Sequence, residues 1–174
     1  MSSESSGLGL QVHVVGAVGE HGRSVDIVEA DTFVLGYSIM LMLVDPHVLE
    51  IERQSGFSAA AAFDPGAVVG PFLTTPEELN EYRIGAESTG YAWRVEVKVN
   101  SDLVWQGIYD TGLTFSEMLS KASSTAAVVP GDLIAWPAVR IPPLDETSLG
   151  RNLLPSDKVL VKVEGLGALT ATIS

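Results

Sequence analysis

Cysteine is absent from the 174 residues of the chain, and basic residues are scarce. The lack of a thiol excludes a disulfide framework and a thiolate site. Ten lysine and arginine residues stand against 22 aspartate and glutamate residues, which gives a formal net charge of −12. A charge of this sign repels phosphate backbones, so we do not expect nucleic acid as a partner.

Long hydrophobic runs are missing as well. The longest one, residues 39–44, is far too short to cross a bilayer. Residues 1–6 are polar and lack the basic start and the apolar stretch of a signal peptide. We therefore expect a cytoplasmic protein without a membrane partner, with a disordered tail at residues 1–6 and a single domain at residues 7–174.

Glycine and proline are plentiful, with 17 and 9 residues, and together with many valines they favour strands and turns. Polar and apolar residues alternate in segments 8–16, 91–100 and 158–164, which is the period of a half-buried strand. Residues 37–44 are almost continuously apolar and predict a strand that is buried on both faces. The predicted fold class is α+β and mostly β, a mixed antiparallel β-sandwich or roll with a few short helices.

The first alternating segment predicts two faces. Leu8 and Leu10 fall on one face, and Gln11 and His13 fall on the other. Hairpins are expected where Asn100 begins a turn after the second segment and where Gly165 interrupts the third.

Four short helices are expected from their capping residues. Ser24 and Gly36 would cap a helix over residues 25–35. Asp45, followed by a proline, would open a helix that runs to about Arg53. Two capping boxes, with their threonines at Thr75 and Thr114, each predict the start of a further helix.

Several short motifs occur in an order that resembles the C-terminal domain of the fumarylacetoacetate hydrolase superfamily. These are Gly36-Tyr37-Ser38, Phe63-Asp64, Gly70-Pro71-Phe72-Leu73, Pro130-Gly131-Asp132 and Glu164-Gly165-Leu166-Gly167. The resemblance covers nearly the whole chain and implies that family's fold. It also implies a homodimer, for which the strand over residues 93–99 offers an apolar face.

Enzymes of that superfamily hold a divalent cation with the carboxylates of an E-x-E motif and of an aspartate in the strand that follows. Aligned by motif, these positions are Leu8, Leu10 and Met42 in this chain, and the substrate-binding TGTP turn begins at Trp136. Hard cations need oxygen ligands, which these side chains do not supply. The resemblance therefore implies a protein that holds no metal and no other cofactor.

The same alignment predicts a substrate-binding site made of residues that would converge, namely Leu8, Leu10, Met42, Phe63 and Trp136. They would form an apolar pocket, with Trp136 as a stacking wall, or they would close the cavity as ordinary core. His47 and Glu50 lie three residues apart on one helical face. They are the predicted catalytic acid–base pair, or a solvated surface pair.

The function expected from these residues is metal-independent isomerisation or cyclisation of a small, largely apolar substrate that carries a carbonyl or enol group. A polyketide-like intermediate of secondary metabolism would suit such a pocket. One alternative is a non-catalytic relative that binds a ligand or acts as a scaffold. The other is a divalent-metal-dependent hydrolase or decarboxylase with other ligands, for instance Asp45, Glu50 and Asp64.

Overall fold

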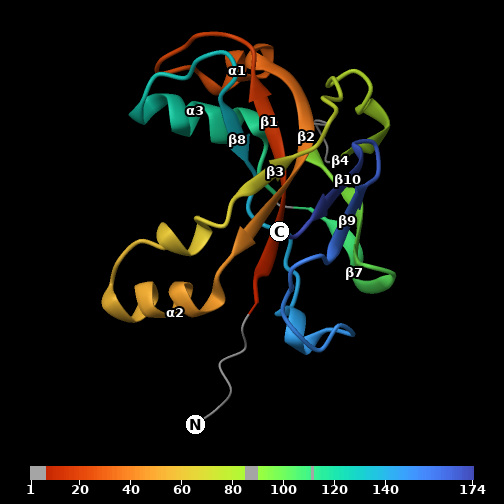
Figure 1. Cartoon of the computed structure of the whole chain (residues 1–174). Helices are drawn as coiled ribbons and strands as arrows, with labels where there is room; N and C mark the ends of the chain where they lie inside the picture. Colours follow the sequence, from red (N-terminus) through yellow and green to blue (C-terminus); the bar gives the residue numbers. More distant parts are fainter. Residues whose placement is uncertain (1–6, 85–89, 111) are drawn as a thin grey trace.

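Two four-stranded antiparallel sheets pack against each other in the computed structural model, which describes residues 7–84, 90–110 and 112–174 (Figure 1). The first sheet has the order β3-β2-β1-β8. Its strands are β1 (Gly9–Val18), β2 (Val34–Val44), β3 (Ala67–Val69) and β8 (Leu133–Ala135).

The second sheet has the order β10-β9-β6-β7, and it lies to the right of the first in Figure 1. Its strands are β6 (Trp93–Val99), β7 (Asp102–Tyr109), β9 (Lys158–Val163) and β10 (Gly167–Thr172). A separate two-stranded ribbon joins β4 (Arg83–Ile84) to β5 (Gly90–Tyr91). The predicted fold class, α+β and mostly antiparallel β, is confirmed.

The core lies between the two sheets and follows the alternation of their strands. Val12 and Val14 of β1 are fully buried, whereas His13 between them is only partly buried. Val97 of β6 and Val161 of β9 are fully buried from the opposite sheet. Burying an aliphatic side chain of this size contributes about 1.5–3 kcal/mol, so this interior is the main source of stability.

Among the described residues, three α-helices flank the sheets: α1 (Ile27–Ala30), α2 (Pro46–Ser55) and α3 (Phe115–Thr125). The predicted start of α2 is confirmed, because the Asp45 carboxylate accepts hydrogen bonds from the N–H groups of His47 and Val48. The predicted capping box of α3 at Thr114 also forms. In Figure 1, α1 and α3 lie together at the upper end of the first sheet and α2 lies at its lower end.

The helix predicted over residues 25–35 is shorter in the structure, so the predicted length is wrong. Only α1 and a 3-10 turn, Asp31–Phe33, are helical, and Ser24 has a left-handed φ of 52° instead of a cap conformation. Gly36, predicted as the C-terminal cap, lies inside β2, where a Cβ would come within 3.0 Å of the Thr74 carbonyl oxygen. Pairing of this segment with β1 therefore overrides its helical pattern.

The helix predicted at Thr75 is also shorter than expected. Glu78 accepts hydrogen bonds from the Thr75 N–H and hydroxyl, but only turns and a 3-10 helix, Asn80–Tyr82, follow before β4 begins. The tail predicted at residues 1–6 lies outside the described residues. Within the described part of the chain, no helix is both long enough and apolar enough to cross a membrane.

Candidate functional site

The register between β1 and β2 decides which side chains share a face. Leu10 pairs with Leu43, and Gln11 pairs with Met42. Residues directly opposite each other in an antiparallel pair point to the same side of the sheet. Met42 therefore shares the outer face with Gln11, while Leu10 points into the core with Leu43. The prediction that Leu10 and Met42 converge is wrong.

The physical reason is a register error of one residue. Because successive side chains in a strand alternate, a shift by one residue moves every side chain to the other face. The face that carries Met42 is occupied on β1 by Gly9 and Gln11. These two residues, and not Leu8 and Leu10, stand where an E-x-E pair would face the Met42 position.

Trp136 is a core residue. It is 2% exposed, and its indole Nε1 donates a hydrogen bond of 2.9 Å to the carbonyl of Leu113. Its ring packs against those of Tyr37, Trp93 and Phe115. The sequence leaves two possibilities for Trp136, a pocket wall or a core residue that fills the cavity. The structure shows the second.

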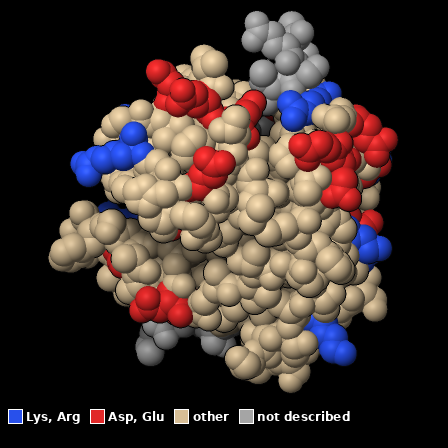
Figure 2. Space-filling model, turned by 90° about the horizontal axis from the view of Figure 1, so that it is seen from above, with Lys and Arg blue, Asp and Glu red and all other residues tan. Residues whose placement is uncertain are grey.

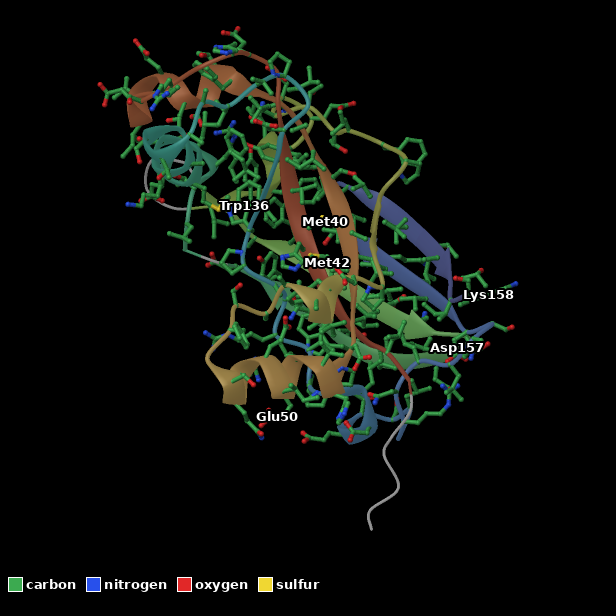
Figure 3. The ribbon with its side chains drawn as sticks, turned by 60° about the vertical axis from the view of Figure 1, so that its left-hand side comes forward. Met40, Met42, Glu50, Trp136, Asp157 and Lys158 are labelled. Carbon is green, nitrogen blue, oxygen red and sulfur yellow. The ribbon has the colours of Figure 1, made fainter. Side chains whose placement is uncertain are left out.

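The other predicted site residues are dispersed. Leu8 is half-buried and forms an isolated bridge with Leu153. Phe63 is half-buried in a 3-10 helix, Ala61–Phe63, that packs beside α2. Only Met42 lies on the outer face of the sheet, where Figure 3 shows it beside Met40. The five residues predicted to bind substrate therefore do not form one pocket.

His47 and Glu50 are both exposed on α2. Glu50 accepts a hydrogen bond of 2.8 Å from the side-chain amide of Gln54, one turn further along the helix. Figure 3 shows Glu50 on the side of α2 that is turned away from Met42. Neither residue lines the groove described next, so their acid–base role stays a prediction.

An open groove of about 610 Å³ lies at the N-terminal end of β1. Gly9 and Gln11 line it from the strand, Arg53 lines it from α2, and the segment 138–146 closes the other side. Its charged side chains are Arg53, Arg140, Asp145 and Glu146, and its apolar lining includes Val44, Val139, Ile141, Leu144 and three prolines. The groove is thus of mixed character, unlike the apolar pocket expected from the sequence.

The chain after β8 builds one wall of this groove because it continues along β1. The N–H of Trp136 donates to the Val14 carbonyl at 2.9 Å, and the N–H of Val139 donates to the Val12 carbonyl at 2.8 Å. The hydroxyl of Tyr109 donates to the Pro137 carbonyl, and burial raises the pKa of that phenol. Arg140 directly follows Val139, so these contacts hold it at the groove.

A second set of contacts holds the loop that carries Asn152, another residue that lines the groove. The Asp157 carboxylate accepts two hydrogen bonds from the Arg151 guanidinium, at 2.6 and 3.0 Å, and one from the Asn100 amide at 2.9 Å. Hydrogen bonding from Arg151 is the main reason why the pKa of Asp157 lies well below its ordinary value. The loop that carries Asn152 is thereby tied to the second sheet.

Arg53 and Arg140 are the functional candidates that the sequence alone did not reveal. Both guanidinium groups are exposed, and in the parts of the chain that the structure describes no ion pair joins either of them to a carboxylate. A guanidinium free of an internal partner can bind a carboxylate or an enolate oxygen of a ligand. The only sequence signal was the position of Arg140, directly after the turn that begins at Trp136.

The residues present do not fit a hard divalent cation. Gly9, Gln11 and Met42 offer a single amide oxygen where the resemblance expects three carboxylates. Over residues 7–84, 90–110 and 112–174, no three His, Asp or Glu side chains gather into a metal-binding group. Asp45, one of the alternative ligands, is engaged instead as the cap of α2.

The family model described as fumarylacetoacetate (FAA) hydrolase C-terminal matches residues 2–174. Solved structures share the fold, among them a fumarylpyruvate hydrolase from Pseudomonas aeruginosa in complex with Mn²⁺ and pyruvate, with 19% identity and a TM-score of 0.75. That match covers 99% of this chain and 68% of the other. No curated protein matches the chain.

Two further structures show how widely the fold is used. A 5-carboxymethyl-2-hydroxymuconate delta-isomerase from Mycobacterium smegmatis has 19% identity and a TM-score of 0.68, over 97% of this chain and 59% of its own. A fumarylacetoacetate hydrolase from Exiguobacterium antarcticum has 20% identity and a TM-score of 0.73, over 99% of this chain and 58% of its own. At such identities the likeness establishes the fold and not the reaction.

Proposed function

The chain belongs to the fumarylacetoacetate hydrolase C-terminal family, and from this premise we propose that it is an enzyme that acts without a divalent cation. It binds a small molecule with a carbonyl or enol group in the groove beside Gly9 and Gln11, and it promotes isomerisation or cyclisation. The observation that carries this proposal is the replacement of the family's three carboxylates by Gly9, Gln11 and Met42 on one face of the sheet.

The groove contains the groups that such a reaction needs. Isomerisation next to a carbonyl removes a proton from one carbon and returns it to another, with negative charge on the oxygen in between. Arg53 and Arg140 stabilise that charge as an enolate. The carboxylate of Asp145 or Glu146 accepts the proton and delivers it again. No electrons are gained or lost, and water is not consumed.

Cyclisation needs less from the protein. A flexible substrate that is held with its reacting atoms close together gains rate from the restriction of its motion. Val44 and Ile141 provide an apolar wall for this purpose, and Arg140 fixes the carbonyl end. We also propose that the substrate is polyketide-like and that the protein is a homodimer. An acid–base role for His47 and Glu50 stays a proposal as well.

An isomerisation assay tests this function. The purified chain is incubated with 2-hydroxydienoates and 1,3-diketones in D₂O, with and without EDTA, and turnover is followed by absorbance and by deuterium incorporation. We expect turnover of at least one class that EDTA does not lower. Turnover that appears only with added Mg²⁺ or Mn²⁺, and that EDTA abolishes, would contradict the proposal.

A second candidate function is ligand binding or scaffolding without catalysis. The burial of Trp136 among Tyr37, Trp93 and Phe115 favours it, because the interior of the fold is filled at that point. It predicts that the same compounds bind in the groove without any deuterium exchange.

A further inference from the structure

His13, Met40 and Met42 share the outer face of the first sheet. His13 lies directly opposite Met40 in the ladder, and Met42 lies one pair further along, opposite Gln11. Side chains at directly opposite positions have Cβ atoms about 4.5–5.5 Å apart, and diagonal neighbours remain within reach of long side chains. Figure 3 shows Met40 and Met42 side by side on this face. The register therefore brings one imidazole and two thioethers within reach of one another on this face.

The tautomer of His13 is fixed by the protein. Its Nδ1 lies 2.8 Å from the carbonyl oxygen of Trp136. A carbonyl oxygen can only accept a hydrogen bond, so Nδ1 carries a hydrogen, and in the neutral ring it is Nε2 that presents the lone pair. Nε2 is buried and has no hydrogen-bond partner among the residues that the structure describes. A buried polar atom without a partner costs about 1–3 kcal/mol, which points to a group that this nitrogen binds.

We propose that Nε2 of His13 and the sulfur atoms of Met40 and Met42 form a binding site for Cu(I). Thioether sulfur is a soft ligand that selects Cu(I) over Mg²⁺ or Ca²⁺, and neutral imidazole also suits copper. The bond from Nδ1 to the Trp136 carbonyl is the kind of support that orients a metal-binding histidine. Both methionines are half-buried, so an ion can reach them from the surface.

The composition of the chain makes the site easy to isolate. There is no cysteine to compete for Cu(I), and the chain has 4 methionines and 3 histidines in all. Met118 is half-buried on α3, and His21 is exposed in the loop after β1. These two residues provide a matched thioether and a matched imidazole away from the site. Cu(I) binding goes beyond the proposed reaction, and neither depends on the other.

The test is an anaerobic titration of the full chain with Cu(I) in competition with a chromophoric chelator. We expect one ion per chain, and we expect the double variant Met40→Leu, Met42→Leu and the variant His13→Gln each to lower the affinity by about tenfold or more. Met118→Leu and His21→Gln should bind like the wild type. X-ray absorption of the loaded protein should show both sulfur and nitrogen at the copper.

Circular dichroism of each variant checks folding. The methionine-to-leucine changes conserve volume, so they keep the test decisive if His13→Gln does not fold. Absence of Cu(I) binding by the wild type would overturn the proposal. Equal affinity of the wild type and of the folded double methionine variant would overturn it as well.

Discussion

Gln11 lies directly opposite Met42 in the ladder between β1 and β2. In the proposed site, this pair lies on the family's scaffold but gives one face a different chemistry. An amide and a thioether now stand on a surface where carboxylates would hold a hard cation. The adjoining groove instead offers two guanidinium groups, from Arg53 and Arg140. Figure 2 shows acidic groups in the majority on one face of the molecule, in line with the net charge of −12.

Loss of either groove arginine should weaken the binding of an anionic probe. We expect Arg53→Gln and Arg140→Gln each to lower the affinity for a 2-oxo acid such as pyruvate by about tenfold, since a hydrogen bond to a charged group contributes about 1.5–3 kcal/mol. Calorimetric titration measures this change. Both side chains are exposed, so stability should stay within about 0.5 kcal/mol of the wild type.

Lys121→Gln is the matched control for these variants, because it removes one positive charge from an exposed position on α3. It should leave the affinity unchanged. An equal loss in all three variants would mean that only overall charge matters, and it would remove the arginines from the site.

Trp136 should matter for stability and not for ligand affinity. We expect Trp136→Ala to lower the free energy of unfolding by about 3–5 kcal/mol, because it leaves a cavity beside Tyr37, Trp93 and Phe115. Urea denaturation measures this loss. Trp105→Ala removes a half-buried indole from β7 and should cost less. A loss below about 1 kcal/mol for Trp136→Ala would mean that the ring lines an open pocket after all.

Local signals in the sequence predicted most elements correctly. The hairpin of β6 and β7, the cap of α2 at Asp45 and the capping box at Thr114 all form as expected. Gly36 shows where local reasoning fails, because its place inside β2 depends on the Thr74 carbonyl and on β1, which are distant in the sequence. Helical propensity near Ser24 is weaker than the pairing of the adjacent strand.

Asp157 should make stability depend on pH. Hydrogen bonds from Arg151 hold its pKa in the folded state below the value of about 3.9 in an unfolded chain. The ionised carboxylate therefore stabilises the protein above about pH 4, and this contribution is lost as pH falls further. We expect Asp157→Asn to cost about 2 kcal/mol at pH 7 and to flatten the acid limb of the stability curve.

Urea midpoints between pH 2 and pH 7 measure this effect. Glu164→Gln is the control, because its ion pair with Arg94 is exposed on both sides and should contribute less than about 0.5 kcal/mol. An acid limb of equal slope in the wild type and in Asp157→Asn would show that Asp157 does not control it.

The site could be predicted only in part for a simple geometric reason. The order of the motifs indicates which strands carry the site. Because side chains alternate along a strand, an alignment error of one residue places them on the opposite face of the sheet. The motif alignment therefore places Leu10 in the site instead of Gln11, whereas its placement of His13 on the face opposite Leu10 is confirmed. The sequence alone does not predict Arg53, because its position at the groove depends on where the fold places α2 relative to the segment 138–146, which lines the same groove.

Binding of Mn²⁺ by two designed variants tests the central claim, that Gln11 and Met42 occupy the face of the lost metal site. The double variant Gln11→Glu, Met42→Asp places two carboxylates at directly opposite positions, and we expect it to bind Mn²⁺ measurably by calorimetry while the wild type does not. Leu10→Glu, Met42→Asp places them on opposite faces, and we expect no binding and a large loss of stability. Mn²⁺ binding by the second variant, or by the wild type itself, would contradict the account.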